Sequence, residues 1–86
     1  MQYIYPAIFT KEEHESLGTV YNVEFPDLLG CLTFGKSIPE AIKMAREALA
    51  GCIGAMQDRN ETIPDATPFN SVQCNDGFVK LIELDR

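Results

Sequence analysis

Residues 37–58 constrain the fold of this 86-residue chain more than any other part of the sequence. Ser37 and Glu40 match a capping box, and Pro39 is tolerated in the first helical turn. The apolar residues that follow recur at helical spacing, so they form one stripe with charged residues opposite. A helix is therefore predicted from Ser37 to about residues 58–60, with its stripe formed by Ile38, Ala41, Ile42, Ala45, Ala48, Leu49, Cys52, Ile53 and Met56.

Strand patterns surround this helix, three before it and one after it. Their alternation and their aromatic and β-branched residues predict strands at residues 3–10, 19–25, 31–34 and 78–84. Residues 11–18 are polar and predict a hairpin loop, and residues 26–30 predict a turn. Residues 61–68 predict a loop, and one turn of helix is expected within residues 71–75.

The predicted architecture is an α+β domain with the element order β-β-β-α-β. The first strand is apolar on both faces, which favours a central place in a four-stranded sheet of order 3-2-1-4. Pro6 cannot donate a ladder hydrogen bond and should lie near the start of that strand or at a non-pairing position. The helix is expected to cross over to a fourth strand parallel to the first, which makes the sheet mixed. One sheet face then stays free for another protomer or a partner.

The charge balance points toward a basic partner. Seven Lys and Arg residues stand against thirteen Asp and Glu residues, for a formal net charge of −6. Direct phosphate binding draws on clustered basic residues, which this chain lacks, so no direct nucleic-acid binding is expected. An acidic protein attracts a basic one at long range. The charge alone is equally compatible with a role in solubility.

Cysteine usage and the N-terminus bear on the compartment. Cys31, Cys52 and Cys74 are widely spaced, which argues against a disulfide framework or a zinc site and favours buried free thiols. The first residues lack the basic and apolar regions of a signal peptide, and no apolar run reaches the ~18 residues of a membrane span. A cytoplasmic protein without membrane contact is expected.

No catalytic constellation is visible in the sequence. His14 is the only histidine and lies in a polar segment without a nucleophile beside it. A two-metal nuclease needs clustered carboxylates, whereas Asp76, Glu83 and Asp85 are scattered and the first strand has none. The sequence therefore predicts no enzyme, no metal and no cofactor.

Several segments together resemble the N-terminal domain of the HicB antitoxin family. They are the opening Tyr5-Pro6-Ala7-Ile8-Phe9, the turn Glu24-Phe25-Pro26-Asp27-Leu28-Leu29-Gly30-Cys31, the helix residues Glu40-Ala41 and Ala45-Arg46-Glu47-Ala48-Leu49, and Ile63-Pro64. Leu29 stands where the family commonly has a second Pro, and Met44 where an Asn is common.

The resemblance implies a reduced RNase H-like fold and an antitoxin function. Family members bind HicA-type toxins, small basic ribonucleases that cleave mRNA, and mask their active surface. They often carry a C-terminal DNA-binding domain, which the sequence up to Arg86 does not contain, so residues 1–86 are expected to form a single HicB-like domain. A domain this small often gains stability by pairing, and a homodimer or higher oligomer is expected.

The candidate partner-binding residues are Glu24, Phe25, Asp27, Leu28, Glu12 and Glu13. The carboxylates could pair with basic residues on a toxin, but Asp27 could equally stabilise its own turn, and Glu12 and Glu13 could be solvated loop residues. Tyr21, Phe25, Leu28 and Phe34 could form an interface patch or the core, and the sequence leaves both open.

Two other functions remain open on the sequence alone. The chain could be the oligomerisation or ligand domain of a transcriptional regulator whose DNA-binding part is absent. It could also be a divergent RNase H-like nuclease, since a fold does not fix a function.

Overall fold

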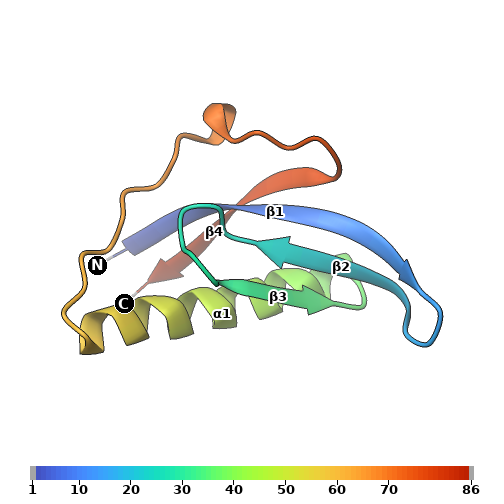
Figure 1. Cartoon of the computed structure of the whole chain (residues 1–86), viewed down its shortest axis with the longest axis horizontal. Helices are drawn as coiled ribbons and strands as arrows, with labels where there is room; N and C mark the ends of the chain where they lie inside the picture. Colours follow the sequence, from blue (N-terminus) through green and yellow to red (C-terminus); the bar gives the residue numbers. More distant parts are fainter. Residues whose placement is uncertain (1, 86) are drawn as a thin grey trace.

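The computed structural model describes residues 2–85, and Met1 and Arg86 of the predicted 1–86 domain lie outside the described residues. The elements are β1 (Gln2–His14), β2 (Gly18–Glu24), β3 (Leu32–Gly35), α1 (Ile38–Asp58), the 3₁₀ turn η1 (Phe69–Ser71) and β4 (Phe78–Asp85). One four-stranded sheet has the order β3-β2-β1-β4, with α1 against one side (Figure 1). The predicted α+β class, element order and strand order are confirmed.

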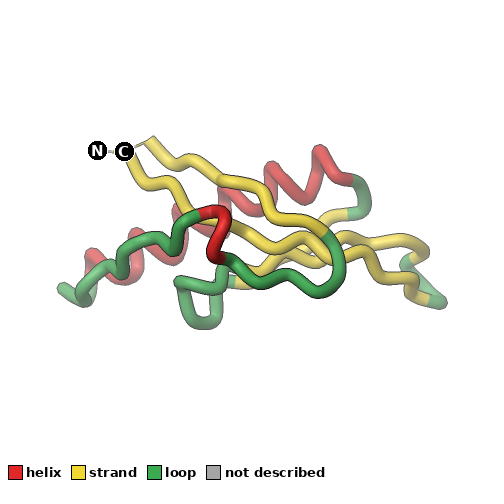
Figure 2. The backbone as a smooth tube through the Cα atoms, turned by 90° about the horizontal axis from the view of Figure 1, so that it is seen from above, coloured by secondary structure: helices red, strands yellow, loops and turns green. Residues whose placement is uncertain are grey.

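The predicted direction of the last strand is wrong, because β4 runs antiparallel to β1. Gln2 pairs with Asp85 and Phe9 pairs with Phe78, so the whole sheet is antiparallel rather than mixed. The reason is the path of residues 59–77. At the end of α1, Gln57 Nε2 donates to Tyr3 Oη at 3.2 Å, so a short connection would have started a parallel strand there. Instead the loop arches back past the strands, on the side away from α1, and β4 begins beside Phe9 (Figures 1 and 2).

The first hairpin is longer than predicted. Strand β1 continues to His14, so only residues 15–17 remain as a turn before Gly18, which has a φ of 75°. Polar side chains extend the ladder because they pair across it. Asn22 Nδ2 donates to Glu12 Oε1 at 2.6 Å, and Thr19 Oγ1 donates to Glu13 at 2.8 Å. A polar stretch can therefore form a strand when its side chains pair with those of the neighbouring strand.

Pro6 lies where β1 has a single neighbouring strand. The ladder to β2 begins only at Ile8, which pairs with Glu24, whereas Pro6 is in register with Leu81 of β4. Because a strand with one neighbour leaves alternate N–H groups unpaired, the missing donor of proline is tolerated there. Residues 2–7 thus present an edge of β1 that β2 does not cover.

The core lies between α1 and one face of the sheet. The face of β1 that carries Tyr5, Ala7 and Phe9 packs on the apolar stripe of the helix. Phe9 is fully buried, and its ring stacks on Phe78 of β4 at a centroid distance of 5.0 Å and an interplanar angle of 8°. The other buried members of this core are Val23, Phe25, Leu28, Cys31, Ala41, Ala45, Leu49, Ile53 and Ile82.

The helix begins as predicted and with a modified cap. Ser37 Oγ accepts from Glu40 N at 3.2 Å, while the Glu40 carboxylate accepts from Lys36 N rather than from Ser37 N. The helical turn expected within residues 71–75 is instead the 3₁₀ turn Phe69–Ser71, which Pro68 precedes. Proline fixes its own φ and lacks an N–H, so it favours a turn that starts directly after it.

Candidate partner-binding surface

The turn between β2 and β3 removes two of the predicted contact residues from the surface. Leu28 N donates to Phe25 O at 3.1 Å and Cys31 N donates to Leu28 O at 3.0 Å, which folds the segment back on itself. Phe25 is 2% exposed and Leu28 is 1% exposed, so both belong to the core and cannot meet a partner in this conformation. Between them and the next strand, Leu29 is fully exposed.

Asp27 has a structural role in the same turn. Its carboxylate accepts from both the backbone N–H of Thr67, at 2.9 Å, and the Thr67 hydroxyl. Charge-assisted hydrogen bonds of this kind are stronger than neutral ones. Asp27 therefore ties the loop of residues 59–77 to the turn, and it does not stabilise its own turn as the sequence suggested it could.

Glu24 lies beside an apolar strip on the edge strand. It is exposed on the sheet face opposite to α1, in register with Leu32 of β3. Leu32 is 64% exposed and Phe34, on the same face of β3, is 49% exposed. Leu32 and Phe34 are called the apolar strip below. The alternation of β3 could have revealed Leu32, whereas nothing in the pattern marked Leu29 as exposed.

Glu12 and Glu13 point to opposite faces of β1. The register puts Glu12 on the same face as Glu24, while Glu13 shares the other face with Thr19. His14 Nε2 lies 3.0 Å from a Glu12 carboxylate oxygen, so this histidine belongs to a surface pair. The six candidate residues thus separate into two core residues, one loop anchor and three exposed carboxylates.

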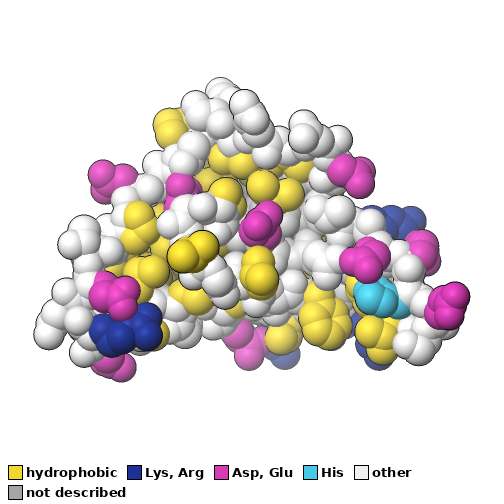
Figure 3. Space-filling model, in the orientation of Figure 1, with side chains coloured by type: hydrophobic (Ala, Val, Ile, Leu, Met, Phe, Trp, Pro, Cys, Tyr) yellow, Lys and Arg dark blue, Asp and Glu magenta, His cyan; other side chains and the backbone are white. Residues whose placement is uncertain are grey.

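Apolar and acidic side chains share one face of the molecule. In Figure 3, hydrophobic side chains gather over the middle with acidic ones among them, and further acidic side chains lie toward the two ends beside a few basic ones. The face is thus suited to a partner that brings both apolar contacts and positive charge.

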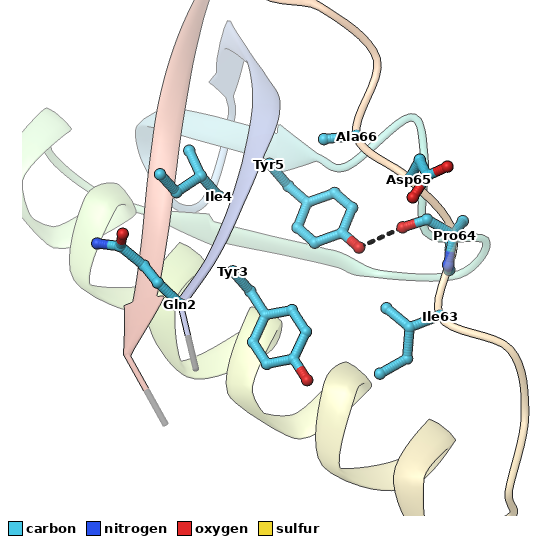
Figure 4. A pocket seen from close by; sticks show the side chains of 8 residues that line it. All are labelled: Gln2, Tyr3, Ile4, Tyr5, Ile63, Pro64, Asp65 and Ala66. Atoms are coloured by element: carbon cyan, nitrogen blue, oxygen red, sulfur yellow. Dashed lines mark hydrogen bonds between the residues drawn. The ribbon is translucent and has the colours of Figure 1, made fainter.

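A cavity of about 350 Å³ lies at the end of the sheet and was not anticipated from the sequence. Its walls are the β1 edge at residues 2–5 and the loop residues 63–66 (Figure 4). Tyr3 and Tyr5 point from β1 toward the loop, and Tyr5 Oη donates to Pro64 O. The pKa of Tyr5 is raised, first by burial and then by the negative charges of Asp27 and Asp65. We call this space the tyrosine cavity.

Cys31 is an inert core residue. It is 1% exposed, and its thiol lies 3.6 Å from Ala48 O. Burial, together with the neighbouring Cys52 side chain, raises its pKa to about 12. Because the thiolate is the reactive form, a pKa this high suppresses reactivity at neutral pH.

We expect alkylation to distinguish the cysteines. At about pH 8, iodoacetamide should modify Cys31 at least ~10-fold more slowly in the folded protein than in urea, because thiolate fraction and access control the rate. Cys74 is the control, since it is half-buried in an otherwise exposed segment and its thiol donates to Asp76 O. Peptide mass spectrometry measures both rates. Equal modification of Cys31 and Cys74 in the folded protein would contradict the burial of Cys31.

Among residues 2–85, no three His, Cys, Asp or Glu side chains come together as a possible metal-binding group. None of the helices in that part of the chain is long and apolar enough to cross a membrane.

Comparison with solved structures supports the fold. A chain of a toxin–antitoxin complex from Streptococcus pneumoniae superposes with a TM-score of 0.86 at 22% identity, over 99% of this chain and 70% of that one. The N-terminal domain of the Burkholderia pseudomallei antitoxin HicB gives a TM-score of 0.74 at 21% identity, over 98% of this chain and all of that one. A chain of a HicA3–HicB3 toxin–antitoxin complex gives 0.71 at 26% identity, over 98% of this chain and all of that one.

Sequence comparison identifies the family. A UPF0150 protein of Thermoplasma acidophilum is 38% identical over 60 residues, which are 70% of this chain and 81% of that protein. An uncharacterized protein from the rep–hol intergenic region of Haemophilus phage HP1 is 29% identical over 75 residues, or 83% of this chain, and the match spans only 56% of that relative. The family model for HicB-like antitoxins matches residues 5–85. The chain therefore belongs to the HicB-like antitoxin family of bacterial toxin–antitoxin systems.

Proposed function

We propose that this chain is the module of an antitoxin that binds a small basic toxin of the HicA type and masks its RNA-cleaving surface. The observation that carries the proposal is the match of the HicB-like antitoxin family over residues 5–85. A structural neighbour is a HicA3–HicB3 complex, in which a chain of this fold is assembled with a toxin. The chain itself acts by binding, without catalytic residues of its own, in the cytoplasm.

The charge and the exposed apolar residues support the same proposal. A chain with a net charge of −6 steers a basic toxin toward itself, and opposite charges fix the register of the complex. The apolar strip supplies the area that must leave water for stable binding. Glu24 and Glu12 lie on the face of the sheet that carries Leu32 and Phe34, so one partner could contact both kinds of group.

Charge reversal tests this surface. With a small basic toxin of the HicA type as the probe, Glu24→Lys should weaken binding ~5-fold or more, because like charges then face each other. Glu47→Lys is the matched control, since Glu47 is an exposed residue of α1 with the same charge change. Calorimetric titration at low and high salt gives both affinities, and binding of the unaltered chain should weaken with salt.

No binding between the unaltered chain and that toxin, together with no inhibition of its RNA cleavage, would overturn the proposed function. Binding that Glu24→Lys and Glu47→Lys weaken equally would retain the function and move the contact away from Glu24. Self-association into a homodimer or higher oligomer stays a prediction, and the solution mass of the free chain tests it.

A further inference from the structure

We propose that the tyrosine cavity is a binding site for an arginine side chain, supplied by the basic partner protein. The identity of that partner rests on the proposed function, whereas the chemistry of the cavity can be tested without it. The cavity has about 350 Å³ of space and opens beside the uncovered edge of β1. A space of this size admits a single long side chain.

The two tyrosine side chains that line the cavity are held in place by the fold. Tyr5 Oη donates to Pro64 O, and Tyr3 Oη accepts from Gln57 Nε2 at 3.2 Å. Both side chains point from β1 toward loop residues 63–66, while Gln2 and Ile4 point to the other side of the strand (Figure 4). Side chains that are ordered before binding cost less conformational entropy when a ligand arrives.

The charge around the cavity selects for a cation. Asp65 lines the wall, and Asp27 lies near enough for both carboxylates to raise the pKa of Tyr5. The ion pairs found within residues 2–85 are Lys11–Glu13, His14–Glu12 and Arg59–Glu61, so none of them neutralises Asp65. The last turn of α1, from which Gln57 reaches Tyr3, contains no basic residue. The C-cap residue Arg59 is basic, but it is paired with Glu61, so its charge is already balanced there.

Arginine fits this combination better than lysine does. A planar guanidinium stacks on aromatic rings and binds a carboxylate with two parallel hydrogen bonds, whereas an ammonium is a compact, strongly hydrated charge. Among the residues that line the cavity, Tyr3 is half-buried and Asp65 is exposed, whereas Tyr5 is 4% exposed and belongs mainly to the core. An apolar side chain in the cavity would bring no counter-charge to Asp65.

The first experiment uses small probes and no toxin. Amide chemical shifts of the whole chain are followed while Nα-acetyl-arginine amide is added, with Nα-acetyl-citrulline amide as the neutral isostere. We expect saturable shifts at Tyr3, Tyr5, Ile63 and Asp65 for arginine, and ~10-fold weaker binding for citrulline, because the charged hydrogen bond is lost. Equal binding of both probes, shifts elsewhere only, or no shifts would overturn the site. Equal binding of the lysine analogue would overturn the choice of arginine.

Matched variants localise the effect. Asp65→Asn keeps the shape of the cavity wall and removes its charge, so the affinity for Nα-acetyl-arginine amide should fall ~10-fold. Glu47→Gln removes one exposed charge from α1 and should leave this affinity unchanged. If the two variants behave alike, the shifts report general acidity rather than this cavity, and the proposal fails.

The second experiment separates this proposal from the proposed function. Toxin affinity is measured for the unaltered chain, Asp65→Asn and Glu47→Gln. If Asp65→Asn alone lowers the affinity for the toxin ~10-fold, as expected for the loss of a charged hydrogen bond, an arginine of the toxin occupies the cavity. If all three proteins bind the toxin with equal affinity, the toxin does not use the cavity, and the proposed function stands. No toxin binding at all, with arginine binding intact, would overturn the proposed function and leave the site.

Discussion

Replacing Gly77 with alanine should destabilise the fold by about 3 kcal/mol or more, because overpacking and a strained backbone add at one position. Gly77 leads into β4 with a φ of 97°, a conformation that residues with a Cβ rarely adopt. An added Cβ would lie 1.9 Å from the carbonyl oxygen of Phe9, and that oxygen belongs to the central strand. Neither backbone can yield without opening the β1–β4 ladder.

Urea denaturation followed by circular dichroism measures this loss, and Gly51→Ala supplies the control. Gly51 lies on the exposed side of α1, where an added Cβ meets nothing within 4 Å. Alanine is favoured over glycine inside a helix by about 1 kcal/mol, so this variant should be more stable than the unaltered chain. If Gly77→Ala is as stable as Gly51→Ala, the backbones of Gly77 and Phe9 are farther apart than in the structure.

Phe9→Ala should cost about 3–5 kcal/mol, the range for large aromatic side chains removed from a core. Phe9 is fully buried on the central strand and stacks on Phe78. At roughly 0.05–0.15 kcal/mol per residue, a chain of 86 residues has about 4–13 kcal/mol of stability, so this loss removes about a quarter of the total or more. We therefore expect Tm, measured by circular dichroism, to fall by more than ~10 °C.

Phe34→Ala is the matched control for Phe9→Ala. Phe34 is 49% exposed on the open face of β3, so its removal should change the free energy of unfolding by less than ~1 kcal/mol. The same variant also tests the apolar strip. Because it stays folded, its affinity for the toxin shows whether Phe34 contributes to toxin binding. Equal losses for the two variants would contradict the assignment of the core to the α1 side of the sheet.

The parts of the fold that could be predicted are those that depend on residues close to one another in the sequence. The stripe of α1 and the Ser37 cap are properties of neighbouring residues, and the two apolar faces of residues 3–10 indicated the central strand. The direction of β4 depends on the path of residues 59–77, which has no periodicity to read. The extra length of β1 depends on partners across the ladder, such as Asn22 for Glu12, which a single-segment pattern does not contain.

The candidate site could be predicted less well, for a related reason. The sequence places acidic residues correctly on the surface at Glu12, Glu13 and Glu24. It could not separate core from surface at Phe25 and Leu28, because a tight turn buries some apolar side chains and exposes others. The tyrosine cavity joins residues 2–5 to residues 63–66, and only the tertiary fold brings these segments together.

The pairing of Gln2 with Asp85 has a practical consequence for anyone who builds on this domain. Both ends of the described chain emerge side by side, next to the tyrosine cavity (Figure 2). An affinity tag or fused protein at either terminus would therefore crowd the same corner and compete with whatever enters the cavity. A label inserted at residues 15–17, in the turn at the far end of the first hairpin, would leave that corner open. Joining the two termini with a short linker would permit new ends at that turn.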